Sequence, residues 1–469
     1  MPTANDTTVK GHVLHHWDPE NPEFWERTGA RIARRNLWIS IISLTLSFAI
    51  WVLWSVVTVN LDKVGFRFTS NQLFWLTALP ALSGATLRVF YSFMVPIFGG
   101  RRWTVISTLS LLLPAVGMGI ALQDSSTSYS TLLILAALCG LGGGNFSSSM
   151  ANISFFYPKA KKGTATGLNA GIGNLGVSLA QFVVPLVISS AMVGGLTGDG
   201  LPYVEHGVEK MLWLQNAGFV WVPFIVISAI LAWFGMNDIA DAKASFKDQA
   251  IIFRRKHNWL MCWLYVGTFG SFIGFSAGLA LLTKSQFPDV NPTQYAFLGP
   301  LVGALTRPVG GWISDRLKAG ATVTLYTFLL MVLGVVGVLF TLPSEGHAGN
   351  FPAFLGMFIL LFALSGIGNG STFRMIPVIF LTARTQEAEK TPEAQRQAVV
   401  QGNKEASAVL GFSGAVGAYG GFFIPKSFGT SLEATGSVDM ALYAFIAFYL
   451  SCMVVTWWFY ARKGARTPC

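Results

Sequence analysis

Long apolar segments alternate with short polar stretches along almost the whole chain. About twelve segments are long enough to cross the ~30 Å hydrocarbon core of a bilayer as helices. They begin near Leu37, Asn71, Trp103, Leu132, Thr164, Phe219, Trp259, Gln294, Ala321, Phe351, Ala406 and Met440. The pattern predicts an all-α membrane protein that crosses the bilayer many times, since a β-barrel would show shorter, alternating segments.

The two halves of the chain repeat each other in sequence. Gly144-Asn145 returns as Gly368-Asn369, and the glycine-rich block at 167–176 returns at 411–420. Two six-helix repeats in the same orientation are the plan of many secondary transporters. The predicted domains are an N-terminal tail (1–36), a six-helix bundle (37–236), a central loop (237–258), a second six-helix bundle (259–461) and a C-terminal tail (462–469).

The distribution of Lys and Arg predicts how the chain is oriented in the membrane. Hydrophobic residues make up 52% of the 469 residues and charged residues only 12%, against ~25% charged in a soluble domain. Basic clusters such as Arg34-Arg35, Lys161-Lys162 and Arg254-Arg255 fall in the tail or in loops expected on one side. The positive-inside rule therefore places both termini in the cytoplasm and accounts for the net charge of +10 without nucleic acid.

Two arginines interrupt apolar segments at matching places. Leu82-Ser-Gly-Ala-Thr-Leu-Arg88 and Leu301-Val-Gly-Ala-Leu-Thr-Arg307 share the spacing Leu-x-Gly-Ala-x-x-Arg. An arginine at the centre of a bilayer costs about 2.5–3.5 kcal/mol on insertion scales, so it usually marks a substrate or ion pathway. The alternative is that both arginines cap helix ends or extend to the membrane surface. A third arginine, Arg374, either adds to the field of a site or bonds to a neighbouring helix.

The polar groups around these arginines favour an anion. By the predicted spans no Asp or Glu lies in the membrane, and the nearest carboxylate is Asp315. A guanidinium matches a planar oxyanion with two parallel hydrogen bonds. Asn145, Asn174, Tyr265 and Ser276 are neutral donors in the same zone, whereas Phe146 and Phe269 are either walls for a flat anion or ordinary core residues.

Glycines recur four residues apart in the repeated blocks. Small residues at this spacing let membrane helices approach closely. One row comprises Gly163, Gly167 and Gly171, and another comprises Gly417 and Gly421. Both rows fit either a sliding contact beside a substrate path or static packing.

The sequence contains no complete motif for nucleotide binding, metal binding or catalysis. Gly171-Ile-Gly-Asn-Leu-Gly176 fits a dinucleotide-binding pattern but lacks the preceding strand and the following acidic residue. The histidines lie in tails or loops and the four cysteines are scattered, so we expect no metal, no cofactor and no enzymatic activity.

The chain resembles the nitrate/nitrite porters of the major facilitator superfamily, and most of all the NarK-type nitrate/nitrite antiporters. The resemblance rests on the stretches at 34–40, 92–103, 149–155 and 268–278, and on two glycine-rich blocks that look like the family's nitrate signatures. It implies the major facilitator fold with 12 transmembrane helices. It also implies that Arg88 and Arg307 bind the anion, that Phe146 and Phe269 sandwich it, and that Asn174 and Tyr265 donate hydrogen bonds.

Further residues complete the candidate site. Asn145, Gly171 and Gly414 join the substrate-binding set, and the candidate gating or helix-packing residues are Gly163, Gly167, Gly417, Gly421, Asp315 and Arg316. The last two belong to Gly311-Trp-Ile-Ser-Asp-Arg316, which resembles the superfamily's cytoplasmic gate motif. Its first-half counterpart, Gly99-Gly-Arg-Arg102, lacks the Asp.

We therefore expect an exchanger of nitrate for nitrite in a bacterial inner membrane. The anion would be held between two arginines while the halves rock about it, and the carrier would act as a monomer. A nitrate/proton symporter is the alternative in the same class, and a sensor that binds nitrate without transporting it is less favoured because the tails are short.

Overall fold

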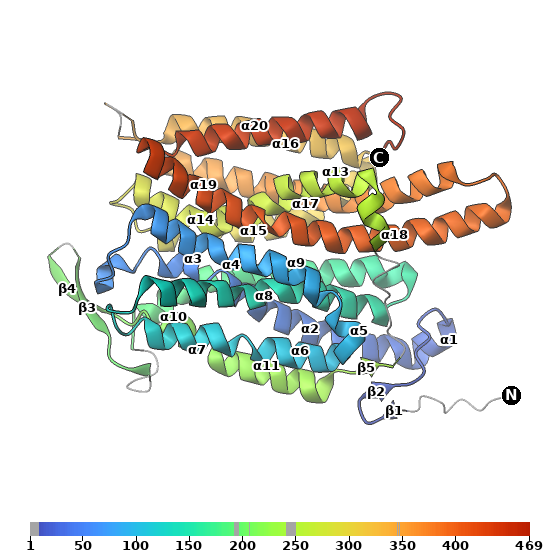
Figure 1. The fold of residues 1–469 in the computed structure, drawn as a ribbon, viewed down its shortest axis with the longest axis horizontal. Helices are drawn as coiled ribbons and strands as arrows, with labels where there is room; N and C mark the ends of the chain where they lie inside the picture. Colours follow the sequence, from blue (N-terminus) through green and yellow to red (C-terminus); the bar gives the residue numbers. More distant parts are fainter. Residues whose placement is uncertain (1–8, 192–196, 206, 241–249, 345, 347) are drawn as a thin grey trace. The chain divides into compact units, whose positions relative to one another are not determined.

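The computed structural model describes residues 9–191, 197–205, 207–240, 250–344, 346 and 348–469. Helices dominate this part of the chain (Figure 1). The chain folds into two compact units. One comprises Met1–Arg67 with Ser83–Ser245, and the other comprises Phe68–Leu82 with Phe246–Cys469. The bounds predicted for the two bundles stay a prediction.

The first unit is built around α2. Its helices are α1 (Pro22–Phe24), α2 (Ala30–Trp51), α3 (Trp54–Val57), α5 (Met94–Phe98), α6 (Gly100–Leu109), α7 (Leu112–Ala121), α8 (Tyr129–Phe156), α9 (Lys159–Ile188), α10 (Asn216–Phe219) and α11 (Val222–Gly235). α2 packs against α8, α9 and α11. Glycine permits two of these contacts, because a Cβ at Gly142 or Gly176 would collide with the carbonyl oxygen of Ser47 or Thr45 on α2.

The second unit is built around α17. Its helices are α13 (Lys256–Tyr265), α14 (Ser271–Gln286), α15 (Leu298–Leu317), α16 (Gly320–Thr341), α17 (Phe351–Glu387), α18 (Pro392–Ala418), α19 (Gly420–Thr435) and α20 (Asp439–Thr456). α17 packs against α15, α16 and α18. A π-helical turn, η5 (Val266–Gly270), joins α13 to α14. π-Turns of this kind are frequent at functional sites.

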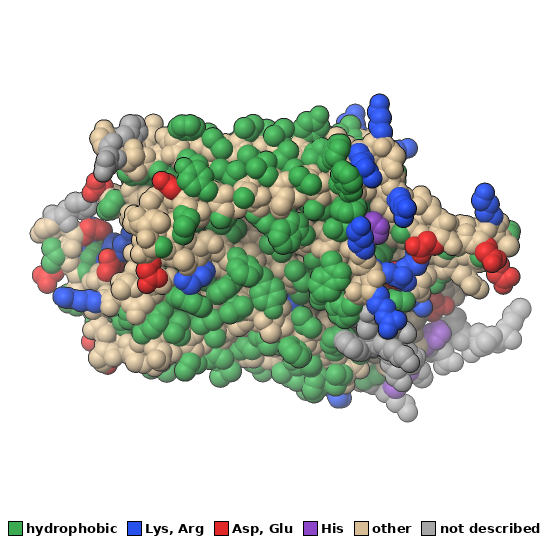
Figure 2. Space-filling model, turned by 45° about the horizontal axis from the view of Figure 1, so that its top comes forward, with side chains coloured by type: hydrophobic (Ala, Val, Ile, Leu, Met, Phe, Trp, Pro, Cys, Tyr) green, Lys and Arg blue, Asp and Glu red, His purple; other side chains and the backbone are tan. Residues whose placement is uncertain are grey.

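Eleven helices of the described chain are long and apolar enough to cross a membrane. The twelfth expected span is α15, which has 20 residues but carries Arg307, Asp315 and Arg316 and so falls outside that group. On the face in Figure 2, hydrophobic side chains cover the middle stretches of the helices and Lys and Arg gather near helix ends. The prediction of a multi-pass helical membrane protein is confirmed.

A folded N-terminal segment belongs to the first unit. β1 (Val9–Lys10) and β2 (Val13–Leu14) form a hairpin, and β2 pairs in parallel with β5 (Asp238–Ile239) after α11. A second hairpin joins β3 (Leu201–Glu205) to β4 (Val208–Leu212). Leu14 is buried in a small core with Trp25, Ala33 and Phe156. The described part of the predicted N-terminal tail therefore packs on the ends of α2 and α8.

Candidate functional site

Arg88 is fully buried near the end of α4 (Ser70–Tyr91). Its Nε–H donates a hydrogen bond of 2.9 Å to the carbonyl oxygen of Gly143 on α8. Its guanidinium carbon lies 4.6 Å from the ring centroid of Phe146 and 5.0 Å from that of Trp51. Two aromatic faces and a carbonyl therefore hold this cation in a fixed orientation, and cation–π contacts are strongest where water is excluded.

Glycines bring the helices around Arg88 close together. A Cβ at Gly84 would lie 2.7 Å from Nε1 of Trp51 and 3.1 Å from the Cα of Gly143. A Cβ at Gly140 would collide with Ser83. The small residues before Arg88 thus let the Gly143 carbonyl reach its guanidinium.

Arg307 lies on α15 in the second unit and is also buried. Its Nη2 donates a hydrogen bond of 3.3 Å to the hydroxyl of Tyr265, and its guanidinium carbon lies 5.4 Å from the ring centroid of Phe373. Its Nη1 is buried and has no hydrogen-bond partner among the described residues. Since buried donors normally find an acceptor, this nitrogen is suited to an oxygen atom of a bound anion.

Tyr265 and Phe269 form an aromatic wall beside Arg307. Tyr265 ends α13 and Phe269 lies in the π-turn that follows. Their ring centroids are 5.6 Å apart with an interplanar angle of 31°. A Cβ at Gly417 of α18 would lie 2.7 Å from Cδ1 of Tyr265 and 3.4 Å from Cδ1 of Phe269. Only a residue without a side chain leaves the Tyr265 ring where it is, whereas the distance to Phe269 would be an ordinary contact.

The two glycine rows differ from each other. Gly421 lies at a close contact, since a Cβ there would be 2.5 Å from Ile273 and 2.7 Å from Ala81. At Gly163, Gly167 and Gly171 nothing lies within 4 Å of a Cβ. Gly163 and Gly167 are exposed on α9, and the predicted role of this row in gating or helix packing stays a prediction.

Asn145 bonds to two neighbouring helices, and its predicted contact with the anion stays a prediction. Its Nδ2 donates hydrogen bonds to Oγ of Ser47 at 2.8 Å and to the carbonyl oxygen of Ser107 at 3.3 Å. It thereby joins α8 to α2 and α6, in a narrow polar slot with Ser40 and Thr108. One helix position separates it from Phe146, which turns the two side chains about 100° apart.

The other candidates lie on α9 and α18, the helices that contain the two glycine-rich blocks. Asn174 of α9 is buried, and its Oδ1 accepts no hydrogen bond within the described chain. Gly171 is half-buried on the same helix, and Gly414 is buried on α18. Their predicted contacts with the anion stay a prediction.

The expected gate motif forms a contact with Arg374. The Nε–H of Arg374 on α17 donates to Oδ1 of Asp315 on α15 at 2.8 Å. Arg374 therefore bonds to a neighbouring helix. Arg316 lies over the ring of Trp312 on its own helix, 5.2 Å from the centroid.

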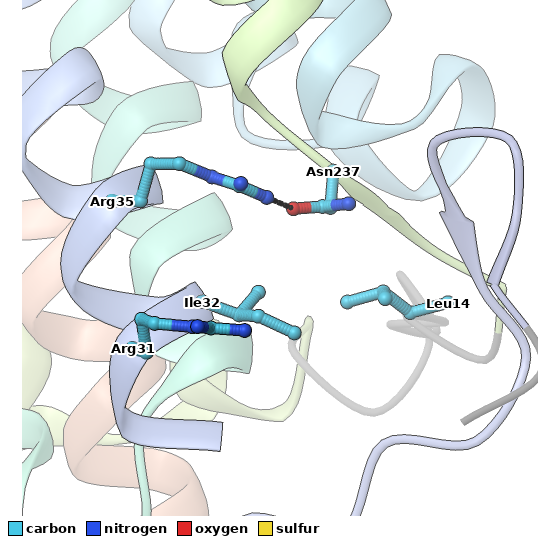
Figure 3. A pocket seen from close by; sticks show the side chains of 5 residues that line it. All are labelled: Leu14, Arg31, Ile32, Arg35 and Asn237. Carbon is cyan, nitrogen blue, oxygen red and sulfur yellow. Dashed lines mark hydrogen bonds between the residues drawn. The ribbon is translucent and has the colours of Figure 1, made fainter. Parts of the chain in front are cut away.

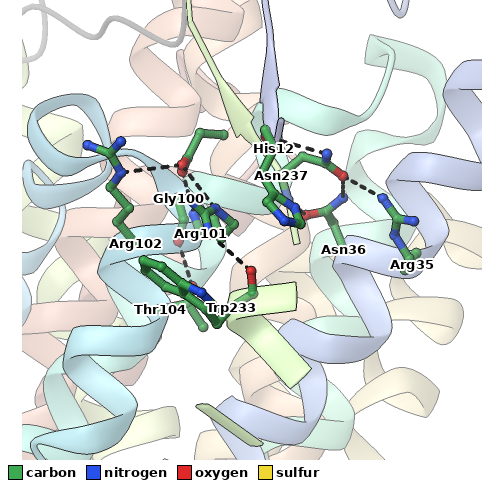
Figure 4. A network of polar contacts seen from close by, with 10 residues as sticks. His12, Arg35, Asn36, Gly100, Arg101, Arg102, Thr104, Trp233 and Asn237 are labelled. Carbon is green, nitrogen blue, oxygen red and sulfur yellow. Dashed lines mark hydrogen bonds and ion pairs between the residues drawn. The ribbon is translucent and has the colours of Figure 1, made fainter. Parts of the chain in front are cut away.

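Asp238 supplies the carboxylate that the first-half motif lacks. The backbone N–H of Arg101 donates to its Oδ1 at 2.8 Å, and the Nε–H of Arg101 donates to Oδ2 at 3.3 Å. Nη1 of Arg101 donates to the carbonyl oxygen of Trp233 (Figure 4). Gly99 has φ of +88°, and a Cβ there would collide with the Asp238 carboxylate. No motif spacing indicated this pair, because Asp238 follows Arg101 by 137 residues.

Removing this carboxylate should destabilise the first unit. Arg101 and Asp238 are both buried, and breaking a buried ion pair costs about 3–5 kcal/mol because one charge stays uncompensated. We expect Asp238→Ala to lower the free energy of unfolding by that amount, as measured by denaturant unfolding in detergent. The exposed Glu209→Ala should change it by less than about 0.5 kcal/mol. Equal stability of the two variants would show that the Arg101–Asp238 pair does not hold these segments together.

A buried carboxylate on α18 lies next to the predicted start of one span. Glu405 is buried within the candidate span that runs from Pro392 to Thr435, one residue before the predicted start at Ala406. Its Oε1 accepts from Nη2 of Arg255 at 3.0 Å, and its Oε2 accepts from Nε and Nη2 of Arg384, each at 3.0 Å. Since Glu405 precedes the predicted span, the expectation of spans without Asp or Glu stays a prediction. The helix itself begins at Pro392, well before the apolar segment that marks the predicted span.

Comparisons with known proteins agree with this architecture. The model of the Major Facilitator Superfamily matches residues 37–425, so the chain belongs to that superfamily. The nitrate/nitrite transporter NarU of Escherichia coli is 52% identical over 452 residues, covering 96% of this chain and 97% of that protein. The probable nitrate/nitrite antiporter NarK2 of Thermus thermophilus is 43% identical and covers 98% of this chain and 99% of its own length. Within the superfamily, the chain is a NarK-type nitrate/nitrite porter.

A solved structure supports the fold. The crystal structure of a D-xylose-proton symporter superposes with a TM-score of 0.62 at 13% identity and covers 91% of this chain and 98% of its own. The predicted major facilitator fold is confirmed, and so is the prediction of a transporter rather than an enzyme.

Proposed function

We propose that the chain exchanges nitrate for nitrite across a bacterial inner membrane, with both termini in the cytoplasm, acting as a monomer. One observation carries the proposal. Two arginines at the same position of the sequence repeat are both buried, and each has its guanidinium beside aromatic rings. Relatives named as nitrate/nitrite transporters, 43–52% identical to this chain, give the substrate.

The chemistry of the two arginines suits nitrate. Nitrate and nitrite are flat, weakly hydrated oxyanions, and a guanidinium is a flat donor that cannot lose its charge at physiological pH. The contact of Nε of Arg88 with Gly143 orients one guanidinium, and Tyr265 orients the other. In this proposal both arginines bind one anion, and Phe146 and Phe269 provide flat walls that exclude bulkier anions.

Charge balance supports exchange. A site with two guanidiniums carries a charge of +2 when empty, and closing it around that charge removes water that would screen it. One bound anion cancels half of the charge and attracts both cations, so closure becomes favourable only when the site is loaded. The carrier would then cross between its inward and outward states with an anion each time, as in alternating access.

Proteoliposomes loaded with nitrite test the proposal. Nitrite should leave the vesicles only when nitrate or nitrite is present outside, and the rate should vary little between about pH 6 and 8, since a His, Asp or Glu proton relay is not part of the proposed site. Vesicles that contain no anion should take up no nitrate, with or without an inward proton gradient. Sustained accumulation driven by that gradient would instead establish the nitrate/proton symporter.

A further inference from the structure

A cavity of about 510 Å³ lies at the start of α2 in the first unit. Its described lining is Leu14 of the N-terminal hairpin, Arg31, Ile32 and Arg35 of α2, and Asn237 after α11 (Figure 3). Neither the proposed exchange nor the candidate anion site uses any of these residues. α2 contributes Arg31, Ile32 and Arg35 to the lining, and Leu14 and Asn237 lie across from them.

Two arginines give the cavity a positively charged lining. Arg31 and Arg35 are four residues apart and therefore lie on one face of the helix. Nη2 of Arg35 donates to Oδ1 of Asn237 at 2.7 Å, which fixes its direction. Arg31 has no hydrogen bond or ion pair within the described chain, and no described carboxylate lines the cavity. A negatively charged ligand would satisfy both guanidiniums.

The same face of α2 continues into the membrane. Arg31, Arg35, Trp38 and Ile42 form an exposed stripe at spacings of four, three and four residues, with Trp38 48% and Ile42 43% exposed. The apolar segment of α2 begins at Leu37, so the arginines lie at the level of lipid headgroups. On this placement Trp38 lies at the membrane–water boundary, where tryptophans are enriched, and Ile42 lies among acyl chains.

From this order along the helix we propose that the cavity binds the phosphate of an anionic phospholipid. The phosphodiester would accept hydrogen bonds from Arg31 and Arg35, the glycerol region would pack on Ile32 and Leu14, and an acyl chain would follow Trp38 and Ile42. Basic pockets at the polar ends of membrane helices bind such headgroups. Free inorganic phosphate has the same charged group, but it would gain nothing from the apolar part of the stripe.

Native mass spectrometry of the detergent-purified full-length protein tests the proposal. With phosphatidylglycerol added, the wild-type chain should retain one lipid more strongly than it retains phosphatidylcholine. Loss of a charge-assisted hydrogen bond predicts about a tenfold or greater fall in that retention for Arg31→Gln and for Arg35→Gln. Arg34→Gln is the matched control, because Arg34 is exposed on the same helix turn and does not line the cavity. It should retain the lipid as the wild type does.

Three results would overturn the proposal. An equal fall for Arg34→Gln, or no fall for Arg31→Gln, would mean that the lipid follows general basic charge and not this cavity. Displacement of phosphatidylglycerol by millimolar inorganic phosphate would assign the cavity to free phosphate. Arg31→Gln is the decisive variant, since Arg31 has no bond in the described chain whose loss could disturb folding, and a monodisperse protein confirms that it folds.

Discussion

Lysine in place of Arg88 or Arg307 is expected to remove nearly all nitrate transport while the protein still inserts and folds. An ammonium keeps the charge but not the planar fork, and it loses the contact of Nε with Gly143 or of Nη2 with Tyr265. Weakening a buried, hydrogen-bonded charge contact costs about 2–5 kcal/mol, which corresponds to a fall of about 30-fold to 4,000-fold. Initial rates of nitrate/nitrite exchange in proteoliposomes measure this loss.

A control variant shows whether the loss of exchange comes from the candidate site or from any replacement of arginine by lysine. Arg396 is exposed on α18, and Arg396→Lys should exchange anions at the wild-type rate. Near-normal exchange by Arg88→Lys or Arg307→Lys would remove these residues from the list of anion ligands.

Alanine at Gly417 is expected to reduce exchange strongly. Its Cβ would lie 2.7 Å from Cδ1 of Tyr265, so the buried ring must shift and carry its hydroxyl away from Arg307. Forcing an extra methyl group into a packed contact costs about 1–3 kcal/mol, and a site displaced by about 1 Å can lose about 100-fold in rate. We expect a fall in exchange of about tenfold to 100-fold, together with weaker nitrate binding.

Gly411 provides a control for this prediction. Nothing lies within 4 Å of a Cβ at this position, and Gly411 belongs to the same helix as Gly417. Gly411→Ala should leave the free energy of unfolding within about 0.5 kcal/mol of the wild type. If Gly417→Ala exchanged as fast as Gly411→Ala, Tyr265 would have no positioning role.

The fold and the arginines could be predicted from sequence because both repeat. The spacing Leu-x-Gly-Ala-x-x-Arg marks one position twice, and long apolar segments mark the spans. The aromatic partners were harder to predict. Phe146 lies near Arg88 as expected, but the contact of Trp51 with Arg88 was not predicted. Both rings come from other helices, and the periodicity of α4 does not indicate which rings contact Arg88.

Partners that are far apart in sequence account for what sequence reasoning missed. Asp238 completes a motif near Arg101 from beyond α11, and Glu405 joins Arg255 and Arg384 from two other segments. The glycine rows show a second limit. Spacing by four residues identifies a helix face, but only the structure shows that Gly417 meets a ring while Gly167 meets nothing.

Nitrate binding to the purified protein tests the central claim most directly. Isothermal titration calorimetry on the wild type, Arg88→Lys and Arg307→Lys gives both the affinity and the number of anions bound per chain. If the two arginines share one anion, the wild type binds one nitrate per chain and each single variant loses binding. Two nitrates per chain in the wild type, or one nitrate bound with unchanged affinity in either variant, would contradict a shared site.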